Sequence, residues 1–249
     1  MRFKIFFLIV LTSIGFYCFI TAFAAQPGGA ENNPPKVRII TPLNNSRFQW
    51  NAIMNYAISV SDKEDGTSEY NEIPAGEVLL RVVYLKDSST IEKYLSDKAN
   101  NGDIEPAGLS LIKTSACFTC HASKNKLIGP SLQLIAKRYP NNPTSIETLA
   151  KKLMKGSTGI WGNIPMPPHP DLKTDQAREM IRWILKNNMN PDVTYFTGIE
   201  GVFRTKQKPE KNAGKGVYIL TASYTDHGLN GQPQLSKRGE DTIILKNYF

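Results

Sequence analysis

The sequence predicts a multidomain fold of α and β elements, in which an all-α domain is inserted in, or flanked by, a β-sandwich. Short segments rich in β-branched and aromatic residues occupy residues 36–104 and recur in residues 190–249. Residues 105–189 instead show the apolar periodicity of helices. With 249 residues, the chain is long enough for buried cores in both parts.

The N-terminal 25 residues have the pattern of a cleavable signal peptide. Arg2 and Lys4 supply a positive start, and a nearly continuous apolar run leads to a cleavage site of small residues. We therefore expect an exported, periplasmic protein. The apolar run is long for a signal, so membrane anchoring by residues 5–25 is the alternative. Residues 26–35 are rich in Pro, Gly and Asn and predict a linker.

Six β-strands are expected in order along the chain. Three precede the helical segment and three follow it, and they are expected at residues 37–40, 52–60, 78–85, 201–205, 216–226 and 242–246. Three strands are too few for a stable sandwich, whereas six would close a small one. Residues 36–104 and 190–249 are therefore expected to form one discontinuous β-module. Two independent β-fragments are the alternative.

Two of these strands carry a resemblance. Residues 216–226 begin with Gly-Val-Tyr and end with Thr-Asp, and residues 60–66 combine Val-Ser-Asp with an acidic turn that closes on a glycine. Both resemble strands of immunoglobulin-like modules of the polycystic-kidney-disease and fibronectin III type. The acidic turn contains Asp62, Glu64 and Asp65, whose carboxylates are either a Ca²⁺ site or an ordinary solvated turn.

Helix signals divide the central segment. Pro106 suits the first turn of one helix. A second is expected to start at a capping box, with Thr144 at the cap and Glu147 three residues later, and to end at Gly156. A third is expected from about Thr174, with its apolar residues on one face.

The motif that carries chemistry is Cys-Phe-Thr-Cys-His at residues 117–121. This spacing is the attachment site of a c-type haem. Cys117 and Cys120 are expected to bind one haem c covalently by thioether bonds, and His121 to ligate its iron. Two Cys and one His do not complete a tetrahedral zinc site, and the βαβ context of a thiol–disulfide oxidoreductase is absent from the pattern.

Residues 105–189 resemble a small bacterial class I cytochrome c. The resemblance extends to Ile-Gly-Pro-Ser-Leu at 128–132 and to Gly-Ile-Trp-Gly-Asn-Ile-Pro-Met-Pro-Pro at 159–168. It implies an all-α fold around one haem. It also implies that the carbonyl of Pro130 accepts from Nδ1–H of His121, that Met166 is the second axial ligand of the iron, and that the indole of Trp161 points toward a haem propionate.

Alternatives remain for each implied role. Pro130 suits a plain turn, and Trp161 would also serve as hydrophobic cover of the haem edge. Met166 could be a packing residue that leaves ligation to another side chain or leaves the iron open. The side chains considered in its place are Met154, Met180, Met189 and His169.

A haem with two axial protein ligands has no vacant position for a substrate, so we expect a single-electron carrier and not an enzyme. The combination of the two modules resembles chains in which a cytochrome accepts electrons from a quinoprotein sugar dehydrogenase of β-propeller fold. We therefore expect electron transfer from a periplasmic dehydrogenase to another carrier or an oxidase. A haem enzyme with an open iron site, peroxidase-like, and a β-module binding protein with an accessory haem are the alternatives.

Charge suggests the kind of partner. Residues 105–189 carry twelve Lys or Arg and five Asp or Glu, a local charge of +7, whereas residues 34–104 carry eight and ten, a local charge of −2. A basic haem-bearing segment favours a redox partner with an acidic docking face, although a plain Lys-rich surface would look the same. The sequence lacks a nucleic-acid-binding motif.

Overall fold

A computed structural model describes residues 31–100, 105–187, 189–211 and 215–247. Every element below belongs to the unit Asn32–Phe249. The expected signal peptide at residues 1–25 and the first half of the expected linker, residues 26–30, lie outside the described residues. Within the described ranges, no helix is both long enough and apolar enough to cross a membrane.

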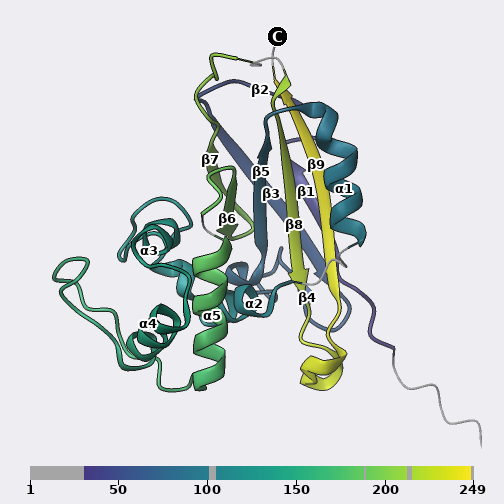
Figure 1. Cartoon of the computed structure of the whole chain (residues 1–249). Helices are drawn as coiled ribbons and strands as arrows, with labels where there is room; N and C mark the ends of the chain where they lie inside the picture. The colour runs from purple at the N-terminus through teal and green to yellow at the C-terminus, as the bar shows by residue number, and fades with distance from the viewer. Residues whose placement is uncertain (1–30, 101–104, 188, 212–214, 248–249) are drawn as a thin grey trace, which may run out of the picture. The chain divides into compact units, whose positions relative to one another are not determined.

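Within the described residues, nine strands form two sheets, which Figure 1 shows as two layers. The first sheet contains four strands in the order β1-β3-β4, with β7 also paired to β3. The second contains five in the order β2-β9-β8-β5-β6, and only its β2–β9 pair is parallel. The strand bounds are Lys36–Thr41 (β1), Arg47–Phe48 (β2), Ile53–Asp62 (β3), Gly66–Thr67 (β4), Leu79–Leu85 (β5), Val193–Thr197 (β6), Glu200–Arg204 (β7), Val217–Thr225 (β8) and Arg238–Asn247 (β9).

The two sheets share one apolar core. Side chains from β1, β3 and β7 meet side chains from β5, β8 and β9, including the fully buried Leu80, Leu220 and Leu245. Strands from before and after the helical segment lie next to each other in both sheets, because β7 pairs with β3 and β8 pairs with β5. The chain therefore leaves the two sheets after β5 and re-enters them at β6.

The two-residue strands β2 and β4, strand β6 and helix α1 were not expected from the sequence. Strand β6 is the first strand after the last helix, and it pairs antiparallel with β5 at the edge of the five-stranded sheet. Helix α1 (Ile91–Asn100) has no buried residue, so it lacks the apolar stripe that would have revealed it. It lies beside β9, where Lys98 makes an ion pair with Glu240 and a 3.3 Å hydrogen bond to Thr242 (Figure 1).

The helical segment contains α2 (Ala107–Thr114), α3 (Leu132–Arg138), α4 (Pro143–Lys155) and α5 (Thr174–Asn187). Helices α2, α3 and α4 all pack against α5 around a second apolar core. Gly108 allows the close approach of α2 to α5, because a Cβ at this position would lie 2.6 Å from Cβ of Trp183.

The expected start of α4 is wrong by two residues, and its cap is a different side chain. Asn142, and not Thr144, is the N-cap, because its Oδ1 accepts from the amide of Ser145 at 2.8 Å and Pro143 occupies the first turn. Glu147 instead pairs with Arg178 of α5 at 2.8 Å. The expected end is confirmed, since Gly156 caps α4 with a φ of 77°.

The second core also includes residues of the β-sheet. Leu79 of β5 and Tyr195 of β6 belong to it, and the ring centroids of Tyr195 and Trp183 lie 5.2 Å apart with planes at 65°. The helical segment therefore packs on the face of the five-stranded sheet that points away from the core shared by the two sheets.

Candidate haem site

The Cys-x-x-Cys-His motif forms a tight turn directly after α2. Ala116 adopts a left-handed conformation with a φ of 53°, and one turn of 3₁₀-helix covers Cys117–Thr119. The amide of His121 donates to the carbonyl of Cys117 at 2.9 Å. This turn brings both thiols and the imidazole to the wall of one pocket.

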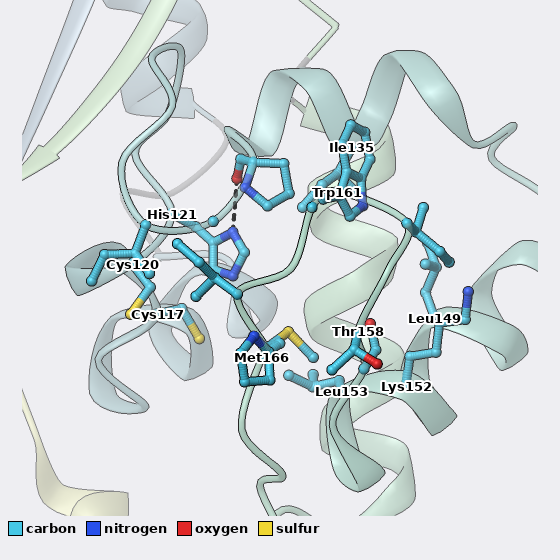
Figure 2. A pocket seen from close by; sticks show the side chains of 18 of the residues that line it. Cys117, Cys120, His121, Ile135, Leu149, Lys152, Leu153, Thr158, Trp161 and Met166 are labelled. Atoms are coloured by element: carbon cyan, nitrogen blue, oxygen red, sulfur yellow. Dashed lines mark hydrogen bonds between the residues drawn. The ribbon is translucent and has the colours of Figure 1, made fainter.

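The pocket encloses a cavity of about 280 Å³ and has a mainly apolar lining. Its walls come from the motif, the loop before α3, helices α3, α4 and α5, and the loop that contains Met166 (Figure 2). The apolar side chains that line it include Ile128, Leu132, Ile135, Leu149, Leu153, Ile160, Ile164, Ile181 and Ile184. A flat, largely apolar group would be shielded from water on most sides here.

The orientation of His121 is set by the backbone of the following loop. Its Nδ1 lies 2.7 Å from the carbonyl oxygen of Pro130, as the dashed line in Figure 2 shows. A carbonyl can only accept a hydrogen bond, so Nδ1 carries a proton, and in the neutral ring the lone pair is then on Nε2. A neutral imidazole with a free Nε2 lone pair is the form that ligates a metal.

Gly129, for which no role was expected from the sequence, contributes to the same arrangement. A Cβ at this position would collide with Cε1 of His121 and lie 2.8 Å from its Nδ1. The amide of Gly129 donates to the carbonyl of Cys120 at 2.9 Å, which holds the loop against the motif. The signal in the sequence that could have indicated this role is its position directly before Pro130 in the Ile-Gly-Pro-Ser-Leu motif at residues 128–132.

Met166 lies on the opposite loop, which the end of α4 holds in place. Met166 and Ser157 form an isolated β-bridge, with amide-to-carbonyl distances of 2.8 and 3.1 Å. Pro165 and Pro167 restrict the backbone on either side. Figure 2 shows the thioether of Met166 and the imidazole of His121 in the same pocket.

The other side chains considered for this role lie elsewhere or serve in packing. Met180 of α5 is 1% exposed and forms part of the pocket wall within the second core. Met154 packs against that core without lining the pocket, and Met189 is 53% exposed. His169 does not line the pocket, and its amide donates to the carbonyl of Met154.

Trp161 lines the same pocket. The guanidinium of Arg138, at the end of α3, lies 4.9 Å from the centroid of its ring. This cation–π contact holds the indole and adds a positive charge beside it. An arginine at this place was not expected from the sequence.

The acidic turn gives no support to a Ca²⁺ site. Oδ1 of Asp62 accepts from the amides of Glu64 and Asp65, each at 2.9 Å, and Asp65 is turned toward Tyr224 and His227. Across the described part of the chain, no group of three or more His, Cys, Asp or Glu side chains is placed to hold a metal ion.

The residues of the pocket fit a haem. Burial raises the pKa of the Cys117 thiol to about 11, so this thiol is protonated at neutral pH and neutral within the apolar wall. Two thiols, an imidazole and a thioether then share one mainly apolar cavity. This donor set suits a covalently bound porphyrin with iron.

Comparison with known proteins agrees with this chemistry. The family model for cytochrome c matches residues 107–188. The chain is 40% identical over 78 residues to cytochrome c-551 of Azotobacter vinelandii, which covers 31% of this chain and 94% of that protein. It is 37% identical over 79 residues to cytochrome c-552 of Hydrogenobacter thermophilus, covering 32% of this chain and 80% of that protein. The crystal structure of Nitrosomonas europaea cytochrome c552 is 38% identical, with a TM-score of 0.30, and covers 30% of this chain and 94% of that one.

The helical segment therefore defines a c-type cytochrome. The chain belongs to the cytochrome c family through residues 107–188. Its cofactor is one covalent haem c, and it is an electron-transfer protein and not an enzyme. The relatives named here correspond to about a third of this chain, so they do not describe the two sheets.

Proposed function

We propose that this protein is an exported mono-haem cytochrome c that carries single electrons, with Cys117 and Cys120 as the thioether attachment sites and His121 and Met166 as the axial ligands. One observation carries the proposal. Two thiols, an imidazole with a free Nε2 and a thioether line one mainly apolar pocket, although Met166 is separated by 45 positions from His121 in the sequence.

The bound haem supplies a reversible one-electron change at its iron. The protein's own residues supply position and environment. The hydrogen bond from Nδ1–H of His121 to Pro130 keeps the imidazole in one orientation, and Pro165 and Pro167 limit the movement of the Met166 loop. A rigid loop and an apolar wall keep reorganisation small when the charge on the cofactor changes.

A haem enzyme with an open iron is the less favoured function. It would need Met166 to be a packing residue only, and the β-bridge to Ser157 instead holds this residue at the pocket. A peroxidase-like site would also need an acid–base side chain on the open side. Apart from His121, the described lining residues include no His, Asp or Glu, and the charged ones are Lys126 and Lys152.

We further propose that residues 36–104 and 190–249 form an immunoglobulin-like module into which the cytochrome domain at residues 105–189 is inserted. The pairing of β8 with β5 and the core common to both sheets support this. Its role would be to dock a partner or to space the haem from a surface. In the same proposal, residues 1–25 are a signal peptide and residues 26–35 a linker, so the haem would be attached in the periplasm.

The partner proposed is a periplasmic dehydrogenase that presents an acidic face to the haem pocket and whose electrons pass on to another carrier or an oxidase. Lys126 and Lys152 line the pocket and would face such a partner. Electron transfer from the candidate dehydrogenase should slow with added salt, and Lys152→Gln should slow it at low salt. Lys93→Gln, on the exposed face of α1, is the matched control and should not. Equal rates for both variants would contradict docking at the pocket.

The experiment that tests the carrier proposal is a visible spectrum with a pyridine haemochrome, on protein matured in a periplasm that attaches c-type haem. Covalent, low-spin haem with a Met–Fe(III) charge-transfer band is the expected result. Cys117→Ala together with Cys120→Ala should abolish covalent haem. A high-spin spectrum in the unmodified protein would overturn ligation by Met166 and favour the enzyme. Absence of covalent haem, when a control cytochrome matures normally, would overturn the attachment itself.

A further inference from the structure

A second cleft lies between the β-sheets and the loop that follows the haem-attachment motif. It encloses about 380 Å³ and is lined from three sides. One wall is the loop Ala122–Asn125. The others are the edge strands β6 and β7, which belong to different sheets and lie at the same edge in Figure 1. This cleft is separate from the haem pocket, since no described residue lines both.

The interior of the cleft is apolar and aromatic. The rings of Tyr84 and Tyr218 are 6% and 3% exposed, lie 5.2 Å apart between centroids and form part of its lining. Phe196 and Phe203 contribute two more rings. At the mouth, Ile53 of β3 and Val202 of β7 leave more than half of their surfaces exposed, at 59% and 54%. Apolar surface at the mouth that continues into an aromatic interior suits the body of a small organic ligand.

The charges around the cleft are unbalanced. Lys124, Arg204 and Lys206 line it, and Asp192 is the single carboxylate among its described lining residues. Lys206 makes an ion pair with Asp192 and lies 5.3 Å from the centroid of the Tyr84 ring. Lys124 donates to the carbonyl of Pro191 at 2.8 Å. The cleft therefore has two more positive than negative side chains.

The two lysines are close enough to disfavour each other's charge. Burial, and secondly the charge of Lys206, lower the pKa of Lys124 to about 8, although Asp192 opposes this. An ammonium can donate three hydrogen bonds, and the structure gives Lys124 one partner within the described chain. An anion placed between the two ammonium groups would relieve their repulsion and use the remaining donors.

We propose that this cleft binds a small organic anion with an aromatic body, such as an aromatic carboxylate, with its charge held between Lys124 and Lys206 and its ring against Tyr84 and Tyr218. Binding would also brace the loop that follows His121, because Lys124 belongs to that loop. The site does not depend on the electron-carrier function proposed above, since none of its residues lines the haem pocket.

Calorimetric titration of the oxidised holoprotein with 2-naphthoate tests the proposal, with naphthalene-2-carboxamide as the neutral ligand of the same shape. We expect saturable one-to-one binding of the carboxylate and at least tenfold weaker binding of the amide. Lys124→Gln and Lys206→Gln should each weaken binding by about tenfold, and Asp192→Asn should strengthen it, because it removes the competing carboxylate.

Two matched variants locate the effect. Lys208→Gln changes an exposed lysine two positions beyond Lys206 and outside the cleft, and should bind like the unmodified protein. Lys152→Gln tests the haem pocket as the site and should also have no effect. Absence of saturable binding, equal affinity for the amide, or weakening by Lys152→Gln with none by Lys124→Gln would each overturn the proposal. Two of the cleft variants, Lys124→Gln and Lys206→Gln, should weaken binding, whereas Asp192→Asn should strengthen it. If one of the three misfolds, the other two still test the proposal.

Discussion

The carbonyl oxygen of Pro130 lies 2.7 Å from Nδ1 of His121, so a backbone group, and not a side chain, orients the proposed iron ligand. Pro130 is buried, and because it has no amide hydrogen, its nitrogen needs no hydrogen-bond acceptor there. Gly129 lies against the same ring, which leaves the loop no space for a larger residue. The imidazole is therefore held between the Cys-x-x-Cys-His motif, to which it belongs, and the closely packed loop that contains Gly129 and Pro130.

Gly129→Ala is expected to change the iron environment without removing the haem. The added Cβ would lie 2.8 Å from Nδ1 and 3.0 Å from Nε2 of His121, so the ring or the loop must move. Overpacking of this kind costs about 1–3 kcal/mol of unfolding free energy. Redox titration and thermal unfolding of the holoprotein measure the two effects. Gly76→Ala is the control, because a Cβ there has no atom within 4 Å. Equal behaviour of the two variants would show that the loop has room to adjust.

The site could be predicted largely because its parts are encoded as short local motifs. The spacing of Cys117, Cys120 and His121 predicts covalent attachment of a haem even when the fold is unknown. The contact of Arg138 with Trp161 could not be predicted in this way, because it joins the end of α3 to a loop more than twenty positions later. Contacts of this kind depend on the packing of helices, which no local spacing encodes.

Met166→Ala is expected to leave haem attached but to open the iron to added imidazole. Met166 is the proposed ligand on the side of the pocket opposite His121, and alanine has no donor atom to replace the thioether. Titration with imidazole, followed in the visible spectrum, measures the opening. Met180→Leu is the matched control, since it replaces a buried methionine of the same pocket with a side chain of similar volume. Opening by Met180→Leu alone would move the assignment to Met180.

The fold was harder to predict where an element depends on its neighbours. Helix α1 has no buried residue and is held on the sheet by contacts such as the ion pair of Lys98 with Glu240. Strand β6 is short, and its pairing partner β5 lies more than a hundred positions earlier. By contrast, α5 starts at Thr174 as expected, because its apolar residues repeat with the period of a helix.

Removing one partner of the Glu105–Lys113 ion pair should destabilise the protein strongly. The side chains are 6% and 3% exposed, and Nζ of Lys113 lies 3.2 Å from Oε2 of Glu105. Lys113→Met leaves the carboxylate buried with only the more distant Arg238, at 3.7 Å, and should cost about 3–5 kcal/mol. Urea unfolding of the holoprotein measures the loss.

The exposed pair Lys93–Asp97 provides the comparison for this experiment. Its side chains are 78% and 58% exposed, so Lys93→Met should change the unfolding free energy by less than about 1 kcal/mol. The double variant Glu105→Gln with Lys113→Met should lose less than the sum of its single variants, because neither partner is then left charged alone. Additive losses would mean that the two side chains do not stabilise each other.

Asp65 should stabilise the protein in a way that is lost in acid. Burial raises the pKa of this carboxyl, but hydrogen bonds from Tyr224 at 2.7 Å and from the amide of His227 at 3.0 Å, with the charge of His227, outweigh burial and leave the pKa below its usual value. A lowered pKa in the folded state means that folding favours the ionised form. Its contribution is present above the unfolded pKa of about 3.9 and disappears as the pH falls through the folded value.

Asp65→Asn should therefore be less stable than the unmodified protein at pH 7, and the difference should shrink as the pH falls below about 4, because the unmodified protein then also loses the charge. Urea unfolding of both holoproteins at neutral and at acid pH measures this. Glu64→Gln, at the exposed neighbouring position of the same turn, should show no such change with pH. A difference that stays constant into acid would mean that the hydrogen bonds from Tyr224 and His227 stabilise the turn regardless of charge. The ionised carboxylate is the stronger acceptor of the two forms, so we expect the stabilisation to follow its titration.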